Sequence, residues 1–362
     1  MGSKCELVNQ GYKTGSCLVY KNKEKGNACD ITLKTQNGIP KRLIKSAHLS
    51  RPEHYFSIYQ SGCNLSCKKC HSWNFTKYAN GEWLSPGDIL DMAEQYSQMV
   101  TVNEPRERST SYHALDLCRS CGSCVDIFQD SSMQDGTEQI YLYPTGKKGN
   151  RCPNKINPDK IVLSPQGFGP ARNIIAFTGG DIGCRTEFYE QSSELIKKGN
   201  LNLWILFETN GYGLTPKNLD KLKAAGVDSY WLDIKTFEPD VHKRLTGVTN
   251  EWILRLPEEI IKRDFVLEVL TLVIPGWVEE DQIGAIAKLI YQVDRNIPFT
   301  ILAFFPEYKM KNVPAPNIEH MLKVYETVRE TGLVNVRLAN LGVFAKTESD
   351  YQILLERAGE AI

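Results

Sequence analysis

From residue 55 onward, strand-length apolar runs alternate with segments whose apolar residues recur at helical spacing. One helical segment starts at Ser85 and Pro86, an N-cap residue followed by the residue favoured at the first helical position. Strands that alternate with helices predict a parallel sheet with right-handed crossovers. The six predicted strands are 55–59, 173–177, 203–207, 229–232, 266–273 and 300–304. We therefore expect an α/β fold, a partial (β/α)6 TIM-like barrel whose chemistry lies at the carboxyl ends of the strands.

The polar pattern divides the chain into this barrel and three further segments. Residues 1–50 are polar and turn-rich with short apolar stretches, which predicts an N-terminal β-rich extension of small hairpins. The barrel is expected over residues 51–99 and 171–345, interrupted by a cysteine-rich insertion at 100–170. Residues 346–362 are expected to form a C-terminal helix.

Composition narrows the classes of function. Of the 362 residues, 41% are apolar, which is ordinary for a chain with a sizeable core. The 43 basic residues equal the 43 acidic ones, so net charge favours neither nucleic acid nor a membrane as partner. No apolar run approaches membrane-spanning length, and the first residues lack the apolar core of a signal peptide. The chain has 11 cysteines, and we expect a cytoplasmic protein in which the clustered ones ligate metal instead of forming disulfides.

Three cysteines directly follow the first predicted strand. Cys63, Cys67 and Cys70 have the spacing C-x3-C-x2-C, and thiolates are soft ligands that suit iron–sulfur clusters. Three thiolates hold three corners of a [4Fe–4S] cluster and leave one iron open, whereas an electron-carrying cluster normally has four cysteines. The alternatives are a zinc knuckle with His71 as the fourth ligand, or three unrelated buried thiols.

Polar groups also follow the next strands of the predicted sheet. They are Gly179, Gly180, Asp181, Glu208, Thr209, Asp233 and Lys235. Two adjacent glycines let a ligand approach the backbone closely, and Lys235 can neutralise a carboxylate. The oxygens of Glu208, Thr209 and Asp233 are hard ligands that suit a cation. Taken singly, each motif also fits a tight turn or a solvated loop charge.

Taken together and in order, these motifs resemble those of the radical S-adenosylmethionine (radical SAM) superfamily. The resemblance is to the family of the pyruvate formate-lyase activating enzyme, and it rests on residues 63–71, 179–181, 208–211, 233–235 and 273–277. It implies a partial barrel of the radical SAM type whose [4Fe–4S] cluster binds SAM at the open iron. Reductive cleavage of SAM would give a 5′-deoxyadenosyl radical, which abstracts hydrogen from a substrate.

The same resemblance implies roles for individual residues. Gly179, Gly180 and Asp181 would bind the amino group of SAM, and Lys235 its carboxylate. The adenine-proximal residues would be Val273, Ile274 and Pro275, and a monovalent-cation site would comprise Glu208, Thr209 and Asp233. Two departures stand out: Asp181 replaces the usual glutamate, and the histidine that contacts SAM near the sixth strand of the activating enzyme is absent.

The insertion carries its own cysteine motif. Cys118, Cys121 and Cys124 have the spacing C-x2-C-x2-C, and a Cys-Pro pair follows at Cys152. Three close cysteines plus a distant Cys-Pro are typical of a bacterial ferredoxin ligand set. This predicts an auxiliary [4Fe–4S] cluster, with zinc or a single iron, or no metal at all, as alternatives. Some glycyl-radical activating enzymes have ferredoxin-like insertions here that usually hold two clusters, whereas this segment has cysteines for one.

Four cysteines remain outside both motifs. Cys5, Cys17 and Cys29 are widely and regularly spaced, which favours packing thiols, and Cys184 is unassigned.

Three functions are compatible with the motifs. The first is a radical SAM enzyme that abstracts hydrogen from a protein or peptide, with an external electron donor of the flavodoxin or ferredoxin type. The second is a radical SAM methyltransferase or other carbon-modifying enzyme, in one version dependent on cobalamin. The third is an iron–sulfur electron carrier without catalysis. In each case we expect no nucleic-acid or membrane partner.

Overall fold

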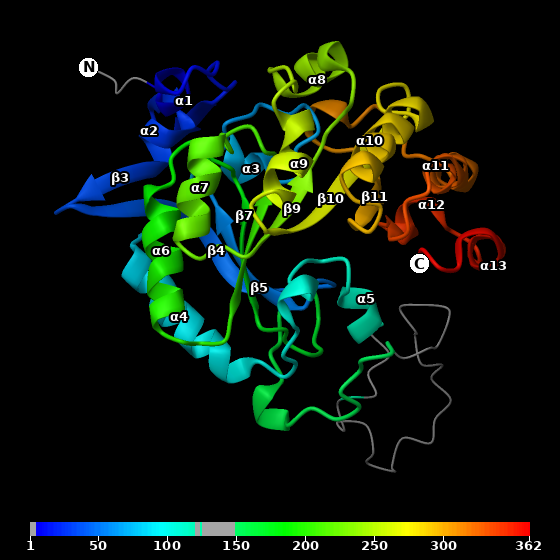
Figure 1. The fold of residues 1–362 in the computed structure, drawn as a ribbon, viewed down its shortest axis with the longest axis horizontal. Helices are drawn as coiled ribbons and strands as arrows, with labels where there is room; N and C mark the ends of the chain where they lie inside the picture. The colour runs from blue at the N-terminus through cyan, green and yellow to red at the C-terminus, as the bar shows by residue number, and fades with distance from the viewer. Residues whose placement is uncertain (1–4, 120–123, 125–148) are drawn as a thin grey trace.

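The computed structural model describes residues 5–119, 124 and 149–362, and its central element is a ten-stranded mixed sheet (Figure 1). Its strands are β3 (Leu33–Gln36), β4 (Ile39–Ser50), β5 (Tyr55–Gln60), β6 (Glu82–Leu84), β7 (Ile174–Gly179), β8 (Trp204–Thr209), β9 (Ser229–Asp233), β10 (Val266–Val273), β11 (Phe299–Ala303) and β12 (Val336–Ala339). The order is β12-β11-β10-β9-β8-β7-β5-β4-β3, with β6 beside β4. A separate antiparallel ribbon consists of β1 (Leu18–Lys21) and β2 (Glu24–Asn27).

Helices connect the parallel strands. The longer ones are α4 (Pro86–Met99), α6 (Glu187–Lys198), α7 (Pro216–Ala224), α8 (Pro239–Thr246), α9 (Leu256–Ile261), α10 (Glu280–Val293), α11 (Ile318–Glu330) and α13 (Glu348–Ala358). The short ones are α1 (Glu6–Asn9), α2 (Ala28–Thr32), α3 (Trp73–Thr76), α5 (Ala114–Leu117) and α12 (Leu341–Phe344). Helix α4 begins as the sequence predicts, because Ser85 and Asp88 form a capping box around its first turn.

The predicted fold class is confirmed, with one strand more than expected. Neighbours from β5 through β12 all pair in parallel, as expected for a partial barrel. The prediction of six strands missed β12, because this strand has only four residues and a charged one among them. Arg337 lies on the inner side of the sheet, where its guanidinium donates to the carbonyl of Tyr112 and pairs with Asp116.

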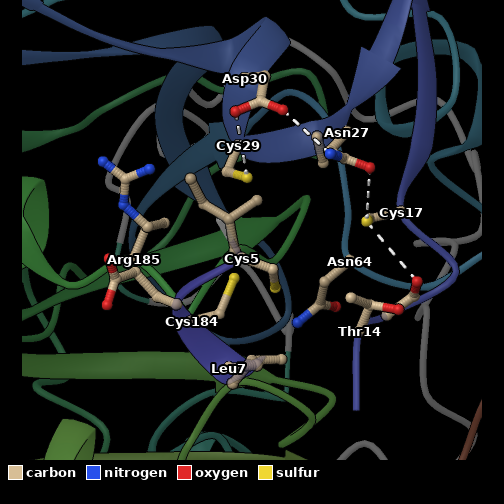
Figure 2. Close-up of a pocket in the computed structure, with 14 residues that line it drawn as sticks. Cys5, Leu7, Thr14, Cys17, Asn27, Cys29, Asp30, Asn64, Cys184 and Arg185 are labelled. Carbon is tan, nitrogen blue, oxygen red and sulfur yellow. Dashed lines mark hydrogen bonds between the residues drawn. The ribbon is translucent and has the colours of Figure 1, made fainter. Parts of the chain in front are cut away.

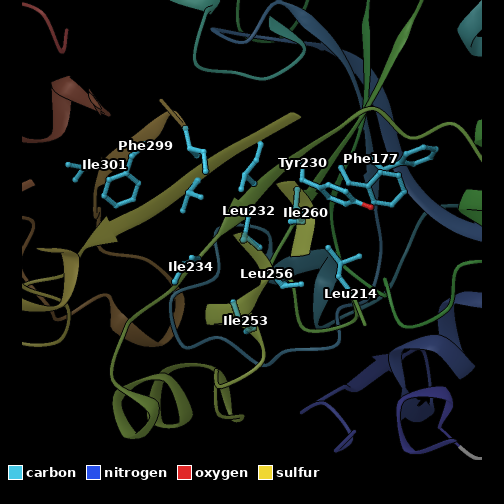
Figure 3. Close-up of a cluster of buried hydrophobic side chains, with 14 of the residues drawn as sticks. Phe177, Leu214, Tyr230, Leu232, Ile234, Ile253, Leu256, Ile260, Phe299 and Ile301 are labelled. Atoms are coloured by element: carbon cyan, nitrogen blue, oxygen red, sulfur yellow. The ribbon is translucent and has the colours of Figure 1, made fainter. Parts of the chain in front are cut away.

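The sheet has an apolar core on each face. The larger core lies between the sheet and the surrounding helices and includes Phe177, Tyr230 and Leu256 (Figure 3). The smaller one lies on the opposite face, where Tyr55 and Leu206 pack with alternate residues of β7. Because successive side chains of a strand point to opposite faces, the residues of the smaller core are those that project into the barrel.

The extension and the insertion lie at opposite ends of the barrel (Figure 1). The extension continues into the sheet, since β4 pairs antiparallel with β5, while α1 and α2 lie near the loops that follow the strands. The described part of the insertion lies where strands begin: Ser229, the first residue of β9, donates to the carbonyl of Ser109 at 2.7 Å. No helix within the described ranges is long and apolar enough to cross a membrane.

Candidate active site at the carboxyl ends of the strands

The loop that carries Cys63, Cys67 and Cys70 joins β5 to α3 and is anchored by backbone hydrogen bonds. The amide of Asn64 donates to the carbonyl of Asp181 at 2.7 Å, beyond the end of β7. Farther along, the amide of Lys68 donates to the carbonyl of Leu245 in α8 at 2.8 Å. Segments that follow different strands therefore fix the loop at the edge where barrel enzymes place their chemistry.

The three thiols of this loop are mutually close and partly buried. Burial and the charge of Asp181 raise the pKa of the Cys63 thiol to about 12. Burial also raises the pKa of Cys67, on which both other thiols act. Binding of iron must therefore displace protons that these thiols otherwise retain.

Within the described residues, the cysteine loop is not arranged as a preformed site for a single metal ion. Across the described residues, no group of three His, Cys, Asp or Glu side chains is arranged to hold one ion. A [4Fe–4S] cluster binds each thiolate at a different iron, so it requires sulfur atoms farther apart than one zinc ion does. The imidazole of His71, the fourth ligand of the zinc alternative, instead packs edge-on against Phe305 with ring centroids 5.4 Å apart.

The paired glycines after β7 bring that strand end against the cysteine loop. The amide of Gly180 donates to the carbonyl of Gln60 at 2.7 Å. A Cβ atom at Gly180 would lie 2.2 Å from the carbonyl oxygen of Gly62. Gly179 has φ +84°, in the region that glycine adopts without strain. Both glycines are therefore required by the backbone packing around the predicted SAM site.

Asp181 uses both carboxylate oxygens within the protein. Oδ1 accepts from the amide of Gly183 at 2.7 Å, and Oδ2 accepts from the hydroxyl of Thr209 at 2.7 Å and the amide of Asn210 at 3.0 Å. The side chain is 8% exposed. These contacts fix the loop after β8 against the loop after β7, and the contact of Asp181 with SAM stays a prediction.

Lys235 and Asp233 form an ion pair beside the cysteine loop. Burial alone would lower the pKa of Lys235, but the charges of Asp233 and Cys67 outweigh it and raise that pKa. Asp233 Oδ1 is buried and has no hydrogen-bond partner in the described part of the chain. The pair thus places an ammonium group and an open carboxylate oxygen near the thiols.

Glu208, Thr209 and Asp233 lie at the ends of the adjacent strands β8 and β9, and the cation site that they would form stays a prediction. Glu208 accepts hydrogen bonds from the hydroxyls of Tyr55 at 2.8 Å and Thr178 at 2.5 Å on the neighbouring strands. Burial raises the pKa of Glu208 to about 7. Thr209 donates to Asp181, as described above, and Asp233 pairs with Lys235.

The segment 273–277 ends β10 and reaches the cysteine loop. Val273 and Ile274 are buried, and the amide of Trp277 closes a turn by donating to the carbonyl of Ile274 at 2.9 Å. The ammonium group of Lys68 lies 5.1 Å from the centre of the Trp277 ring. Pro275 follows Ile274 in this turn, so the adenine-proximal residues predicted from the sequence lie next to the cysteine loop.

The predicted insertion site lies at the other end of the barrel. Cys118 and Cys124 are buried, Cys152 is partly buried, and Cys121 lies outside the described residues. The amide of Ile156 donates to the carbonyl of Cys124 at 2.9 Å, which links the two cysteine-bearing segments. Any metal held there would therefore be remote from Cys63, Cys67 and Cys70.

Arg42 is a positioning residue that the sequence analysis missed. Its buried guanidinium donates to the carbonyls of Thr32 at 3.0 Å, Gly62 at 3.3 Å and Gly180 at 3.4 Å. It therefore connects the extension, the cysteine loop and the glycine pair. Lysines flank it at short distance along β4, so its sequence context resembles that of a solvated charge.

A comparison with protein families finds a match that covers part of this site. A family model for the radical SAM superfamily matches residues 166–290, which include the glycine pair, Asp181 and the Asp233–Lys235 pair. Over these residues the chain is similar to the radical SAM superfamily. Members of this superfamily are expected to hold a [4Fe–4S] cluster and to use SAM.

Curated proteins that are similar to this chain include several named as activating enzymes. A candidate glycyl-radical enzyme activating enzyme from Methanocaldococcus jannaschii is 30% identical over 156 residues, covering 42% of this chain and 58% of the relative. The indoleacetate decarboxylase activating enzyme of Tractidigestivibacter scatoligenes is 28% identical over 62% of this chain and 70% of its own length. The chain spans 58% and 49% of the lengths of two M. jannaschii relatives, the second uncharacterised.

Among solved structures, a domain of a pyruvate formate-lyase activating enzyme from Bacteroides vulgatus is similar to this chain with a TM-score of 0.40 and 17% identity. The similarity covers 46% of this chain and 98% of that one.

Proposed function

We propose that this protein is a radical SAM enzyme of the activating-enzyme type, which abstracts hydrogen from a protein or peptide. The observation that carries the proposal is the assembly of three motifs at one edge of the barrel. The loop with Cys63, Cys67 and Cys70 lies against the Gly179–Gly180 pair and beside the Lys235–Asp233 ion pair.

The described residues fit a three-thiolate cluster and SAM. Cys63, Cys67 and Cys70 would hold the cluster, which when bound supplies the electron that cleaves SAM to methionine and the 5′-deoxyadenosyl radical. Lys235 would neutralise the carboxylate of SAM. The open Oδ1 atom of Asp233 is an acceptor for an ammonium group, and its burial would strengthen that contact.

The nature of the substrate is inferred from relatives. Proteins named as activating enzymes of pyruvate formate-lyase and of indoleacetate decarboxylase match 44% and 62% of this chain. These names support a protein as the hydrogen donor, with a one-electron donor of the flavodoxin or ferredoxin type.

Product analysis tests the proposal. The protein is reconstituted anaerobically with iron and sulfide, then incubated with SAM and dithionite, and products are identified by mass spectrometry. We expect 5′-deoxyadenosine from the wild type and none from Cys67→Ala. Lys235→Met should weaken SAM binding at least tenfold, because loss of a charge-assisted contact costs about 1.5–3 kcal/mol.

Lys243→Met is the matched control, since Lys243 lies exposed on α8 near the same edge. It should bind SAM and form product like the wild type. S-adenosylhomocysteine as the main product would favour methyl transfer instead. Protein with intact clusters that forms neither product would contradict the enzymatic proposal and favour an electron carrier.

A further inference from the structure

Four cysteines outside the two predicted metal motifs line one pocket. They are Cys5, Cys17, Cys29 and Cys184. The pocket comprises about 520 Å³ of space, including the part open to solvent, between the extension and the loop after β7. Asn64 also lines it, so the pocket adjoins the loop that carries Cys63.

Local structure explains how cysteines twelve residues apart come together. Leu18 and Asn27 are the last pair of the β1–β2 ribbon, so the next residues on either side, Cys17 and Ala28, are neighbours. There the amide of Ala28 donates to the carbonyl of Cys17 at 2.8 Å, which brings Cys17 next to Cys29 in α2. Cys5 directly precedes α1.

The fourth cysteine comes from the barrel. Cys184 lies three residues beyond Asp181 in the loop between β7 and α6. The extension packs tightly against the loop that carries Cys63, because a Cβ atom at Gly15 would lie 2.3 Å from the carbonyl oxygen of Asn64. The pocket is therefore bounded by two parts of the chain that are distant in sequence.

The four thiols lie close enough to act on one another. Figure 2 shows the sulfur atoms of Cys5 and Cys184 side by side, with Cys29 and Cys17 approaching from the extension. After burial, the largest influence raising the pKa of Cys184 is the charge of Cys29, and Cys5 and Cys17 contribute as well. Cys5 and Cys17 act in the same way on Cys29.

These thiols have polar as well as apolar neighbours. Cys17 lies 3.4 Å from the amide oxygen of Asn27, and Cys29 lies 3.9 Å from a carboxylate oxygen of Asp30. Arg185 adds a cation to the lining. Cys5, Cys17 and Cys29 are only partly buried. Cys184 belongs to the apolar core and Cys5 and Cys17 pack against it, but the polar contacts of Cys17 and Cys29 are not expected of thiols that serve packing alone.

We propose that Cys5, Cys17, Cys29 and Cys184 bind a further iron–sulfur cluster, of the [4Fe–4S] class. Four thiolates are the full ligand set of a cluster without an open iron, which suits electron transfer or structural cross-linking. The thiols release their protons as they bind iron. The proposal is independent of the reaction assigned above to the loop with Cys63.

A cluster fits better than a zinc ion. Zinc requires four sulfur atoms about 2.3 Å from one point, and even three such groups are not found in the described portion of the chain. The same is true of Cys63, Cys67 and Cys70, where the superfamily implies a cluster. Arg185 would offset part of the negative charge of four thiolates.

Iron analysis tests the proposal in a background without the SAM cluster. The parent carries Cys63→Ala, Cys67→Ala and Cys70→Ala, and is reconstituted anaerobically. Adding Cys17→Ser and Cys29→Ser should remove about four iron and four sulfide ions per chain. The control adds Cys118→Ser and Cys124→Ser instead, which should leave the pocket cluster in place.

Unchanged iron in the Cys17→Ser, Cys29→Ser variant would overturn the proposal. The proposal would also be overturned if the metal that the parent holds and this variant lacks were zinc.

Alkylation of the wild-type holoprotein gives a second test that requires no variant. Cys17 and Cys29 are partly buried, and both should resist iodoacetamide while iron is present. After removal of iron by a chelator, both should be modified at least tenfold faster, as measured by peptide mass spectrometry. Equal rates before and after chelation would contradict the cluster. Neither readout depends on cleavage of SAM, so failure here is distinguishable from failure of the proposed reaction.

Discussion

At the scale of single residues, Glu208 illustrates how the environment changes a side chain that the sequence presents as a cation ligand. Its side chain is partly buried, and desolvation raises its pKa to about 7 from an ordinary value of 4.5. The folded protein therefore binds this proton more tightly than the unfolded chain does. Its contribution to stability is full below pH 4.5 and is lost as the pH rises through 7.

We expect Glu208→Gln to flatten this dependence. A pKa difference of this size corresponds to roughly 3 kcal/mol, so the variant should gain up to that amount relative to wild type between pH 5 and pH 8. Urea unfolding at both pH values measures it. Glu194→Gln, at an exposed site on α6, should instead follow the wild type. An unchanged slope in Glu208→Gln would mean that the carboxylate is already ionised in the fold, as a bound cation would cause.

Residue roles were predictable from the sequence only where spacing carries the chemistry. The spacing of Cys63, Cys67 and Cys70 predicts a shared ligand, and the structure keeps the three on one anchored loop. Arg42 has no such signal, because its role depends on carbonyls from three distant segments. The same is true of Cys184, because the other three cysteines of the pocket lie 155 to 179 residues earlier in the chain.

At the scale of elements, hydrophobic periodicity predicted most of the barrel. The six predicted strands are mainly apolar runs of four to eight residues bounded by polar loops, which is typical of buried strands. Strand β12 was not predicted, because Arg337 interrupts its run of only four residues. The pairing of β4 with β5 was not predictable either, because strand partners depend on tertiary context as well as on local pattern.

The junction between β7 and the cysteine loop yields a prediction about elements. Gly180→Ala would place a Cβ atom 2.2 Å from Gly62 O and 2.6 Å from Gln60 O, both backbone atoms. The strand end and the loop must then separate, at a cost of about 1–3 kcal/mol. We expect less iron per chain after reconstitution and a lower unfolding midpoint.

Gly342→Ala is the matched control for this change. Gly342 lies in α12 with open space around its Cα atom, and alanine is favoured over glycine in helices by about 0.5–1 kcal/mol. Its iron content should equal that of the wild type. If Gly180→Ala kept full iron content and stability, the close packing of the two elements would not be required for the site.

At the scale of the whole molecule, one buried carboxylate ties the insertion to the barrel. Glu104 precedes the predicted metal site in the chain, and it pairs with Arg108 at 2.8 Å and Arg151 at 3.4 Å. It also pairs at 3.4 Å with Arg172, which is fully buried and lies two residues before β7. Both ends of the insertion therefore meet at Glu104.

Glu104→Gln should destabilise the whole chain by about 3–5 kcal/mol, because the buried charge of Arg172 would lose its carboxylate. Because Arg151 is released as well, the segment between residues 105 and 170 should become more sensitive to protease. Urea unfolding and limited proteolysis followed by mass spectrometry measure the two effects. Glu107→Gln, exposed and three residues away, should change stability by less than about 0.5 kcal/mol. Equal behaviour of the two variants would show that the insertion is held by its other contacts, such as the bond between Ser229 and Ser109.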